Sequence, residues 1–263
     1  MRSVLDFERA KREAQPIVLV AAYDALMARI VGESEADAIL VGDSVAMVAY
    51  GYPSTVHATI EMMESHVAAV RRGAPELFVV ADMPFLTARR GMAAAAEAAG
   101  RLIYAGANAV KIEGIAGHAA AFRHVVGSGI PVMAHLGLTP QSYHQLGGNR
   151  IQGRGAAEAE RIRREALEVA ECGAFALVLE CVPAELASTV TAELSIPTIG
   201  IGAGAGTAGQ VIVLSDLLGF DANFRPRFAR RYLDGHAEAL AAVNAFARDV
   251  RCARFPAGEE VLA

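Results

Sequence analysis

The sequence predicts an α/β protein, a (β/α)₈ TIM barrel, from its length and from two patterns along it. The chain has 263 residues, a length typical of one such barrel. Short apolar runs alternate with longer helical patterns from end to end. Most runs are continuous stretches of Val, Ile and Leu, as in strands that are buried on both faces of a parallel sheet. Because periodicity does not show whether a sheet closes, a doubly wound open sheet is the alternative.

The predicted elements follow one another along the whole chain, and no connection indicates a domain boundary. The expected strands are Ile17–Ala21, Ala38–Val41, Leu77–Ala81, Ala109–Ile112, Val132–Ala134, Ala176–Leu179, Thr198–Ile201 and Val211–Leu214. The expected helices between them are Ile60–Arg72, Met92–Ala105, Ala116–Val126, Ala157–Gly173 and Pro183–Leu194. Several helices end at a glycine that accepts the left-handed conformation of a helix end, namely Gly73, Gly106 and Gly173. We expect residues 1–263 to form a single barrel domain with an N-terminal helix (residues 1–15) and a C-terminal helical extension (residues 224–251).

Composition argues against several classes of function. The net charge of −5 leaves no basic surface for nucleic acid. The apolar run Ile17–Ala22 is too short to cross a bilayer or to form the core of a signal sequence, so no membrane partner is expected. The three cysteines have neither the number nor the spacing of a disulfide framework or a cysteine metal site. A reducing cytoplasm is the simplest location.

Ionisable residues stand at the ends of five successive predicted strands. In a parallel barrel the carboxyl ends of all strands lie on one face, so these side chains are expected to converge. Because burying an unpaired carboxylate costs several kcal/mol, the cluster indicates mutual pairing and a bound cation. Oxygen ligands without cysteine favour Mg²⁺ over Zn²⁺. The residues are Asp43, Asp82, Lys111 with Glu113, His135 and Glu180.

Each of these residues also has a plainer interpretation. A single aspartate after a strand is more often a helix cap than a metal ligand, and separate salt bridges would also place charges there. Lys111 is one of two lysines among 24 Lys and Arg residues, which favours a specific use of a compact amine, such as orienting an anionic substrate. His135 is equally well explained as a hydrogen-bonded core residue. The glycine-rich string Gly200–Gly206 follows the seventh strand, a common anion site in barrels, but the pattern alone is weak.

Longer strings carry a more specific signal. Taken together and in order, they closely resemble the 3-methyl-2-oxobutanoate hydroxymethyltransferase family, also called the ketopantoate hydroxymethyltransferases, over nearly the whole chain. The strings are Leu40–Ser44 (LVGDS), Ala69–Pro75 (AVRRGAP), Gly106–Gly114 (GANAVKIEG), Ala134–Ser142 (AHLGLTPQS), Gln152–Gly155 (QGRG), Leu179–Pro183 (LECVP) and Ile199–Gly204 (IGIGAG).

The resemblance implies a barrel of the phosphoenolpyruvate/pyruvate superfamily and an enzyme of pantothenate biosynthesis. The implied reaction joins a one-carbon unit from 5,10-methylenetetrahydrofolate, the co-substrate, to C3 of 3-methyl-2-oxobutanoate. It gives 2-dehydropantoate through an enolate that Mg²⁺ stabilises. The resemblance also implies a homo-oligomer, specifically a homodecamer, whose other partners are small molecules only.

The resemblance assigns roles position by position. Glu180 matches the family's proton acceptor, and His135 matches an active-site histidine that we group with the substrate-binding residues. The positions that match magnesium ligands are Asp43, Asp82 and Glu113. The positions that match substrate contacts are Asp43, Ser44, Asp82 and Lys111.

The sequence departs from the family pattern in two loops. Ala208 stands where the family has aspartate, and Tyr52-Pro53 stands where it has His-Asp. Neither change touches the metal or oxo-acid positions, so we expect loop geometry and folate affinity to be affected, and Ala208 to alter folate handling. The alternatives are a superfamily lyase or mutase acting on another 2-oxo acid, and a weakly active scaffold subunit. Loss of Asp43 or Glu180 would have favoured the scaffold, and both are present.

Overall fold

The computed structural model describes residues 1–261. It divides into two compact units, Met1–Val213 and Leu214–Ala263. The first unit contains all eight strands, and the second contains a helical C-terminal segment. A single domain over the whole chain stays a prediction.

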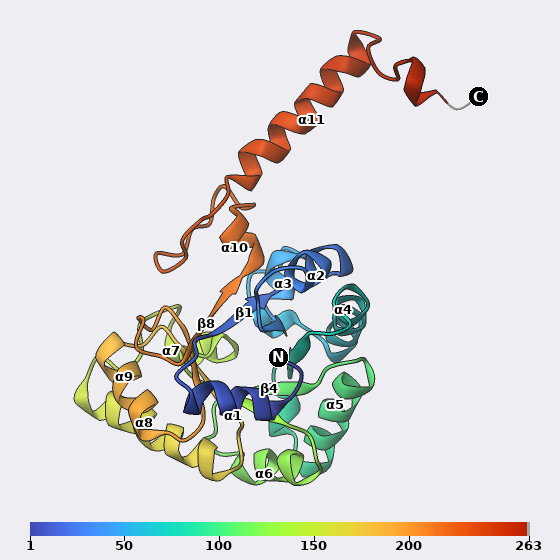
Figure 1. The fold of residues 1–263 in the computed structure, drawn as a ribbon. Coiled ribbons are helices and arrows are strands. Elements are labelled where there is room, and N and C mark those ends of the chain that lie inside the picture. The colour runs from blue at the N-terminus through green and yellow to red at the C-terminus, as the bar shows by residue number, and fades with distance from the viewer. Residues whose placement is uncertain (262–263) are drawn as a thin grey trace. The chain divides into compact units, whose positions relative to one another are not determined.

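The eight strands form a closed parallel barrel, drawn in Figure 1. Each strand pairs with the next in the chain, and the last pairs with the first through the register Ile17↔Gly209. The doubly wound open sheet is therefore wrong, and the barrel is confirmed. The strands are β1 (Ile17–Ala21), β2 (Ala38–Val41), β3 (Phe78–Asp82), β4 (Ala109–Glu113), β5 (Val132–Gly137), β6 (Ala176–Glu180), β7 (Thr198–Ile201) and β8 (Gly209–Val213).

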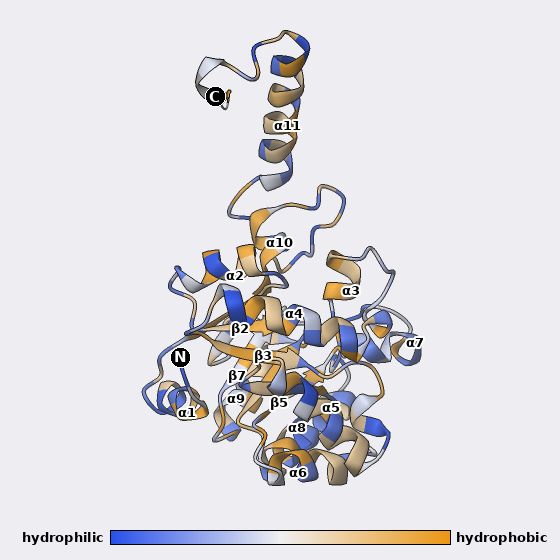
Figure 2. Ribbon diagram, turned by 90° about the vertical axis from the view of Figure 1, so that its right-hand side faces the viewer, coloured by the Kyte–Doolittle hydropathy of each residue, from blue (hydrophilic) through white to orange (hydrophobic). Residues whose placement is uncertain are grey.

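Amphipathic helices surround the strands, and Figure 2 shows apolar strands such as β2 and β3 inside a layer of mixed polarity. The longer helices between the strands each bury apolar residues, as α4 does with Met63, Val67 and Val70. The five predicted helices are present, although α6 begins later than expected. The helices are α2 (Ala25–Gly32), α4 (Ile60–Gly73), α5 (Met92–Tyr104), α6 (Ala119–Gly127), α8 (Ala156–Glu171) and α9 (Ala184–Glu193), with short helices α3 (Val45–Val48) and α7 (Tyr143–Leu146) in the loops.

The N-terminal helix α1 (Val4–Arg12) covers the amino ends of the strands. Its Phe7 is fully buried and meets the rings of Phe78 and Phe175, each with centroids 5.2 Å away. Phe78 begins β3 and Phe175 directly precedes β6, so the contact lies at the end of the barrel opposite the carboxyl ends. The predicted N-terminal helix is present over Val4–Arg12, and its Phe7 closes this end of the barrel with an apolar side chain.

Of the three glycines predicted to end helices in the left-handed conformation, Gly73 at the end of α4 is required for a different reason. Gly106 and Gly173 adopt the predicted left-handed conformation, with φ of 116° and 91°. Gly73 does not. A Cβ there would lie 2.3 Å from the carbonyl oxygen of Ala25, so glycine is needed for close approach of α4 to α2 rather than for its φ angle.

The second unit consists of α10 (Leu214–Leu218), α11 (Gly235–Arg251) and the short turn η4 (Gly258–Glu260). The expected helix over 224–251 was too long at its start, because α11 begins at Gly235. The preceding loop is held irregular by Arg231, which donates to the carbonyl oxygens of Asp221 and Phe224. Across residues 1–261, the helices are too short or too polar for any of them to cross a membrane.

Candidate active site

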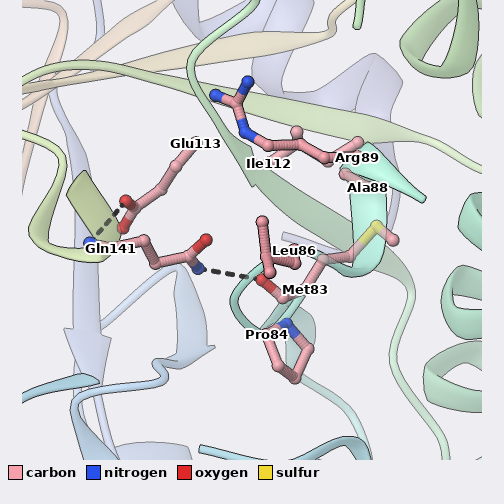
Figure 3. A pocket seen from close by; sticks show the side chains of 8 residues that line it. All are labelled: Met83, Pro84, Leu86, Ala88, Arg89, Ile112, Glu113 and Gln141. Atoms are coloured by element: carbon pink, nitrogen blue, oxygen red, sulfur yellow. Dashed lines mark hydrogen bonds between the residues drawn. The ribbon is translucent and has the colours of Figure 1, made fainter. Parts of the chain in front are cut away.

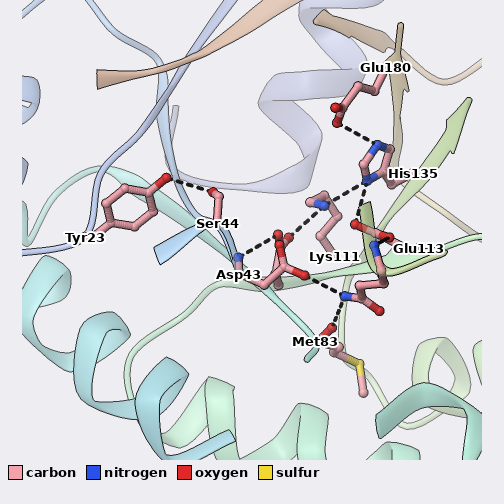
Figure 4. A network of polar contacts seen from close by, with 10 residues as sticks. Tyr23, Asp43, Ser44, Met83, Lys111, Glu113, His135 and Glu180 are labelled. Carbon is pink, nitrogen blue, oxygen red and sulfur yellow. Dashed lines mark hydrogen bonds and ion pairs between the residues drawn. The ribbon is translucent and has the colours of Figure 1, made fainter. Parts of the chain in front are cut away.

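The ionisable residues predicted from the strand ends all lie at the carboxyl ends of neighbouring strands. The register sets Asp82 beside Lys111 and Glu113 beside His135. It also sets Gly137 beside Glu180. Figure 4 shows the side chains turned toward one another from β2 to β6. The structure therefore brings together Asp43, Asp82, Lys111, Glu113, His135 and Glu180.

Asp82 is the centre of one half of this cluster. Its Oδ2 accepts a hydrogen bond of 3.1 Å from the backbone N–H of Asp43, and its Oδ1 lies 3.0 Å from Nζ of Lys111. Asp43, Asp82 and Lys111 are only 3%, 3% and 4% exposed. Buried carboxylates need cationic partners, and Lys111 supplies one positive charge for two aspartates.

His135 joins the other half of the cluster to Lys111. Its Nδ1 lies 3.0 Å from Lys111 Nζ and 3.4 Å from Glu113 Oε1, and its Nε2 lies 3.2 Å from Glu180 Oε2. Desolvation and the charge of Lys111 act to lower the pKa of His135, but the carboxylates of Glu113 and Glu180 outweigh them and raise it to about 9. Each ring nitrogen thus faces one carboxylate, and Nδ1 also faces the amine of Lys111.

The electrostatics around Asp43 favour an added positive charge. Burial first, and then the charges of Asp82 and Glu113, raise the pKa of Asp43 well above its usual range. Lys111 and the amide of Gln141 act in the opposite direction. Burial acts to lower the pKa of Lys111, but the three carboxylates outweigh it and raise that pKa, which keeps the amine charged. This side of the cluster is therefore short of positive charge even with Lys111 ionised.

The donor set fits a hard divalent cation. Asp82 Oδ1 and Glu113 Oε1 are buried without an aligned hydrogen bond. Within residues 1–261, no three His, Cys, Asp or Glu side chains are arranged as a complete metal site. Mg²⁺ does not require one, since it is commonly held by one or two carboxylates and fills its octahedron with water and substrate oxygens. Asp43 and Asp82 provide such a pair. Glu113 contacts His135 instead, with its Oε1 3.4 Å from Nδ1.

Ser44 lies at the edge of the cluster and contacts a residue that the sequence did not single out. Its Oγ is 2.8 Å from the hydroxyl of Tyr23, which follows β1 by two residues. A Cβ at Gly42 would lie 2.8 Å from the same Oγ, so glycine leaves room for Ser44 between these groups. Tyr23 obeys the same strand-end rule as the charged residues. Extending that rule from charges to hydroxyl groups would have found it.

Gln141 was also missed, although it belongs to a string that carries the family resemblance. It lies in η3 (Pro140–Ser142), within the long connection after β5. Its backbone N–H donates to Glu113 Oε2 over 3.0 Å, and its Nε2 donates to Asp43 Oδ2 over 2.8 Å. Residue type alone does not show that a loop glutamine reaches back to carboxylates at the ends of two other strands.

A small cavity adjoins the carboxylates, drawn in Figure 3. Its volume of about 10 Å³ has room for about one water molecule. Glu113 and Gln141 form one wall, so the cavity is continuous with the polar cluster. A cavity of this volume is too small for a 2-oxo acid. The remaining lining residues are Met83, Pro84, Leu86, Ala88, Arg89 and Ile112.

Solved structures share the fold of this chain at low sequence identity. A phosphonopyruvate hydrolase solved with oxalate and Mg²⁺ superposes with a TM-score of 0.65 at 13% identity, covering 99% of this chain and 93% of the other. A 2,3-dimethylmalate lyase, described as a member of the PEP mutase/isocitrate lyase superfamily, gives 0.61 at 17% identity over 100% and 92%. At these identities the likeness shows the fold alone, and it confirms the predicted barrel.

Sequence relatives are much closer. The 3-methyl-2-oxobutanoate hydroxymethyltransferase of Bdellovibrio bacteriovorus is 48% identical over 260 residues, 99% of each chain. Those of Coxiella burnetii and Legionella pneumophila strain Lens are 47% and 48% identical over 95% and 97% of each chain. The model of the family described as ketopantoate hydroxymethyltransferase matches residues 2–258. The chain therefore belongs to the ketopantoate hydroxymethyltransferase family of enzymes.

Proposed function

We propose that this enzyme transfers a hydroxymethyl group from 5,10-methylenetetrahydrofolate to 3-methyl-2-oxobutanoate, giving 2-dehydropantoate for pantothenate and coenzyme A biosynthesis. The observation that carries the proposal is the 47–48% identity, over at least 95% of both lengths, to relatives of that name. The strand-end cluster supports it because deprotonating C3 of a 2-oxo acid needs a base on one side and stabilisation of negative charge on the other.

The charge-stabilising side is the one formed by Asp43 and Asp82. We place a Mg²⁺ ion on these two carboxylates, with Glu113 as a third acidic ligand, because Asp82 and Glu113 each have one buried oxygen without an aligned hydrogen bond and the surroundings of Asp43 are short of positive charge. When bound, the cation supplies Lewis-acid stabilisation of negative charge on the 2-oxo group. Lys111, held charged by its neighbours, offsets the substrate carboxylate, and Ser44 offers a hydroxyl beside Asp43.

The basic side is Glu180. It ends β6, and its side chain is 17% exposed, compared with 4% for Asp82, so it reaches the mouth from a different strand than the proposed ligands. In the proposal Glu180 accepts the C3 proton. His135, 3.2 Å away, orients that carboxylate and lies among the groups that contact the substrate.

The proposal includes an assembly and a location. We propose a homo-oligomer, a homodecamer by resemblance to the family. In α11 the residues Leu240, Val243 and Phe246 are 52%, 63% and 55% exposed, and such an apolar stripe is typically covered by a protein surface. The three cysteines are free, which suits a reducing cytoplasm.

A direct assay tests the function. The enzyme is given 3-methyl-2-oxobutanoate, methylenetetrahydrofolate and Mg²⁺, and the product is identified by mass spectrometry. We expect 2-dehydropantoate, and none when the folate is omitted. Cleavage of an oxo acid or hydroxy acid without folate would instead support the lyase alternative. An inert protein that still forms a defined oligomer would support the scaffold.

A further inference from the structure

Gln141 contacts three of the strand ends that form the active-site mouth. Its side-chain Nε2 donates to Asp43 Oδ2 over 2.8 Å and to the carbonyl oxygen of Met83 over 3.0 Å. Its backbone N–H donates to Glu113 Oε2 over 3.0 Å. Met83 directly follows Asp82, so one loop residue is bonded to β4 and to the segments just after β2 and β3, beside all three proposed cation ligands.

The partners dictate how the amide is oriented. Both groups that face Nε2, a carboxylate oxygen and a carbonyl oxygen, can only accept hydrogen bonds. Turning the amide over would set its oxygen against both of them. The two hydrogens of the NH₂ group are therefore used on Asp43 and Met83, as Figure 3 shows for the bond between Gln141 and Met83.

The choice of a neutral donor matters at this position. Asp43, Asp82 and Glu113 already crowd one region with a single lysine. A cationic side chain would pair with Asp43 and compete with a divalent ion, and an anionic one would add to the repulsion. An amide fixes one carboxylate oxygen of Asp43 without neutralising the charge and leaves the other oxygen available.

We propose that Gln141 is a positioning residue for the cation, holding the Asp43 carboxylate in its binding orientation and fastening the connection after β5 over the mouth. This inference rests on the proposed function, because it takes Asp43 as a ligand. The positioning role belongs to the side chain of Gln141. Its backbone hydrogen bond to Glu113 could be made by any residue except proline.

Two variants remove the amide in different ways. Gln141→Ala deletes the side chain, whereas Gln141→Met keeps its length without a hydrogen-bond donor. An effect that appears in both variants is therefore due to loss of the amide and not to a cavity or to misfolding. The control is Gln145→Ala, which truncates an exposed glutamine in α7 of the same connection. Within residues 1–261, the Gln145 side chain makes no hydrogen bond in this structure.

Mn²⁺ titrations followed by electron paramagnetic resonance measure cation binding without turnover. Removing groups that orient metal ligands typically weakens binding by about 10–100-fold, and we expect that loss in both Gln141 variants and not in Gln145→Ala. Saturating Mg²⁺ should restore kcat while the Mg²⁺ concentration for half-maximal rate stays raised. A purely structural defect would lower kcat at all Mg²⁺ concentrations.

Several outcomes overturn the inference. Unchanged Mn²⁺ affinity in Gln141→Met would show that the amide does not position Asp43, and tighter binding would show that it obstructs the site. Failure of the proposed function looks different. In that case the wild-type protein makes no 2-dehydropantoate, whether or not the Gln141 variants lose Mn²⁺.

Discussion

Gly137 lies against the backbone of Glu180 so closely that a Cβ on it would be 2.3 Å from the Glu180 carbonyl oxygen. The two residues are register partners across β5 and β6. The same carbonyl oxygen accepts a 2.8 Å hydrogen bond from the N–H of Leu138. Gly137 also has a φ of 92°, which disfavours other residues. Gly137 thus helps to determine the position of Glu180 at the end of β6.

Gly137→Ala should damage both stability and chemistry. The added methyl group must push Glu180 away, and overpacking of this kind costs about 1–3 kcal/mol. We expect a lower Tm and slower exchange of the C3 proton of 3-methyl-2-oxobutanoate with solvent. Gly129→Ala is the control, because Gly129 has a similar φ of 86° but no atom within 4 Å of a new Cβ. Equal exchange rates in the two variants would disprove the positioning role of Gly137.

Glu180→Gln should separate binding from proton transfer. Glutamine keeps the size and a polar head, so cation and oxo-acid binding should survive, but it cannot accept the proton. Loss of a general base typically costs about 10²–10⁴-fold in rate. Deuterium exchange at C3, followed by NMR without folate, measures this step. Normal exchange would show that Glu180 is not the base.

Asp43→Asn should lose cation binding and C3 exchange together, and should stabilise the metal-free protein. Asp43 is buried beside Asp82 and Glu113, and these surroundings disfavour its charged form. The asparagine oxygen can still accept from Gln141. A gain on the order of 1 kcal/mol would raise Tm by about 2–4 °C.

Calorimetry with a chelator present measures the Tm of this variant, and Mn²⁺ titration measures its binding. Glu35→Gln removes one negative charge at an exposed site and should change neither. If Asp43→Asn still bound Mn²⁺ as tightly as the wild type, Asp43 would not be a ligand.

The two departures from the family pattern should differ in effect. The expectation that Ala208 alters folate handling is not supported by its position. The Ala208 carbonyl accepts from the N–H of Ile17, and its N–H donates to Thr198, so it lies at the amino ends of β1 and β7. Tyr52 instead follows β2 and stacks on His57, with centroids 4.8 Å apart. His57 belongs to η1 (Thr55–His57), which packs against η3.

Tyr52→His should therefore change the KM for methylenetetrahydrofolate. Ala208→Asp should leave this KM within about twofold of the wild-type value, because Ala208 lies away from the carboxyl ends of the strands. Neither substitution should alter C3 exchange, which needs no folate. Initial rates at varied folate measure the first effect. A folate effect confined to Ala208→Asp would restore the interpretation that the sequence suggested.

The local patterns of the sequence were sufficient for the strands and for the ionisable residues at their ends. A parallel strand buried on both faces needs a continuous apolar run, so β1, β2 and β7 have the bounds that the apolar runs predicted. Because every carboxyl end of a parallel barrel lies on one face, strand position alone placed Asp82 and Glu180 in one cluster. Closure of the sheet required the pairing of β1 with β8, which no local pattern records.

The contacts that loops make across the barrel mouth were decided by the tertiary structure alone. Gln141 reaches Asp43, 98 residues earlier in the chain, and nothing in its neighbourhood in sequence records that partner. Gly73 needs to be glycine because of Ala25 on another helix, not because of its own φ angle. The sequence by itself determined which residues carry charge and on which face they meet, since burial periodicity and strand direction are local properties. The pairing of each charge, and therefore its pKa, depends on side-chain geometry that only the closed barrel fixes.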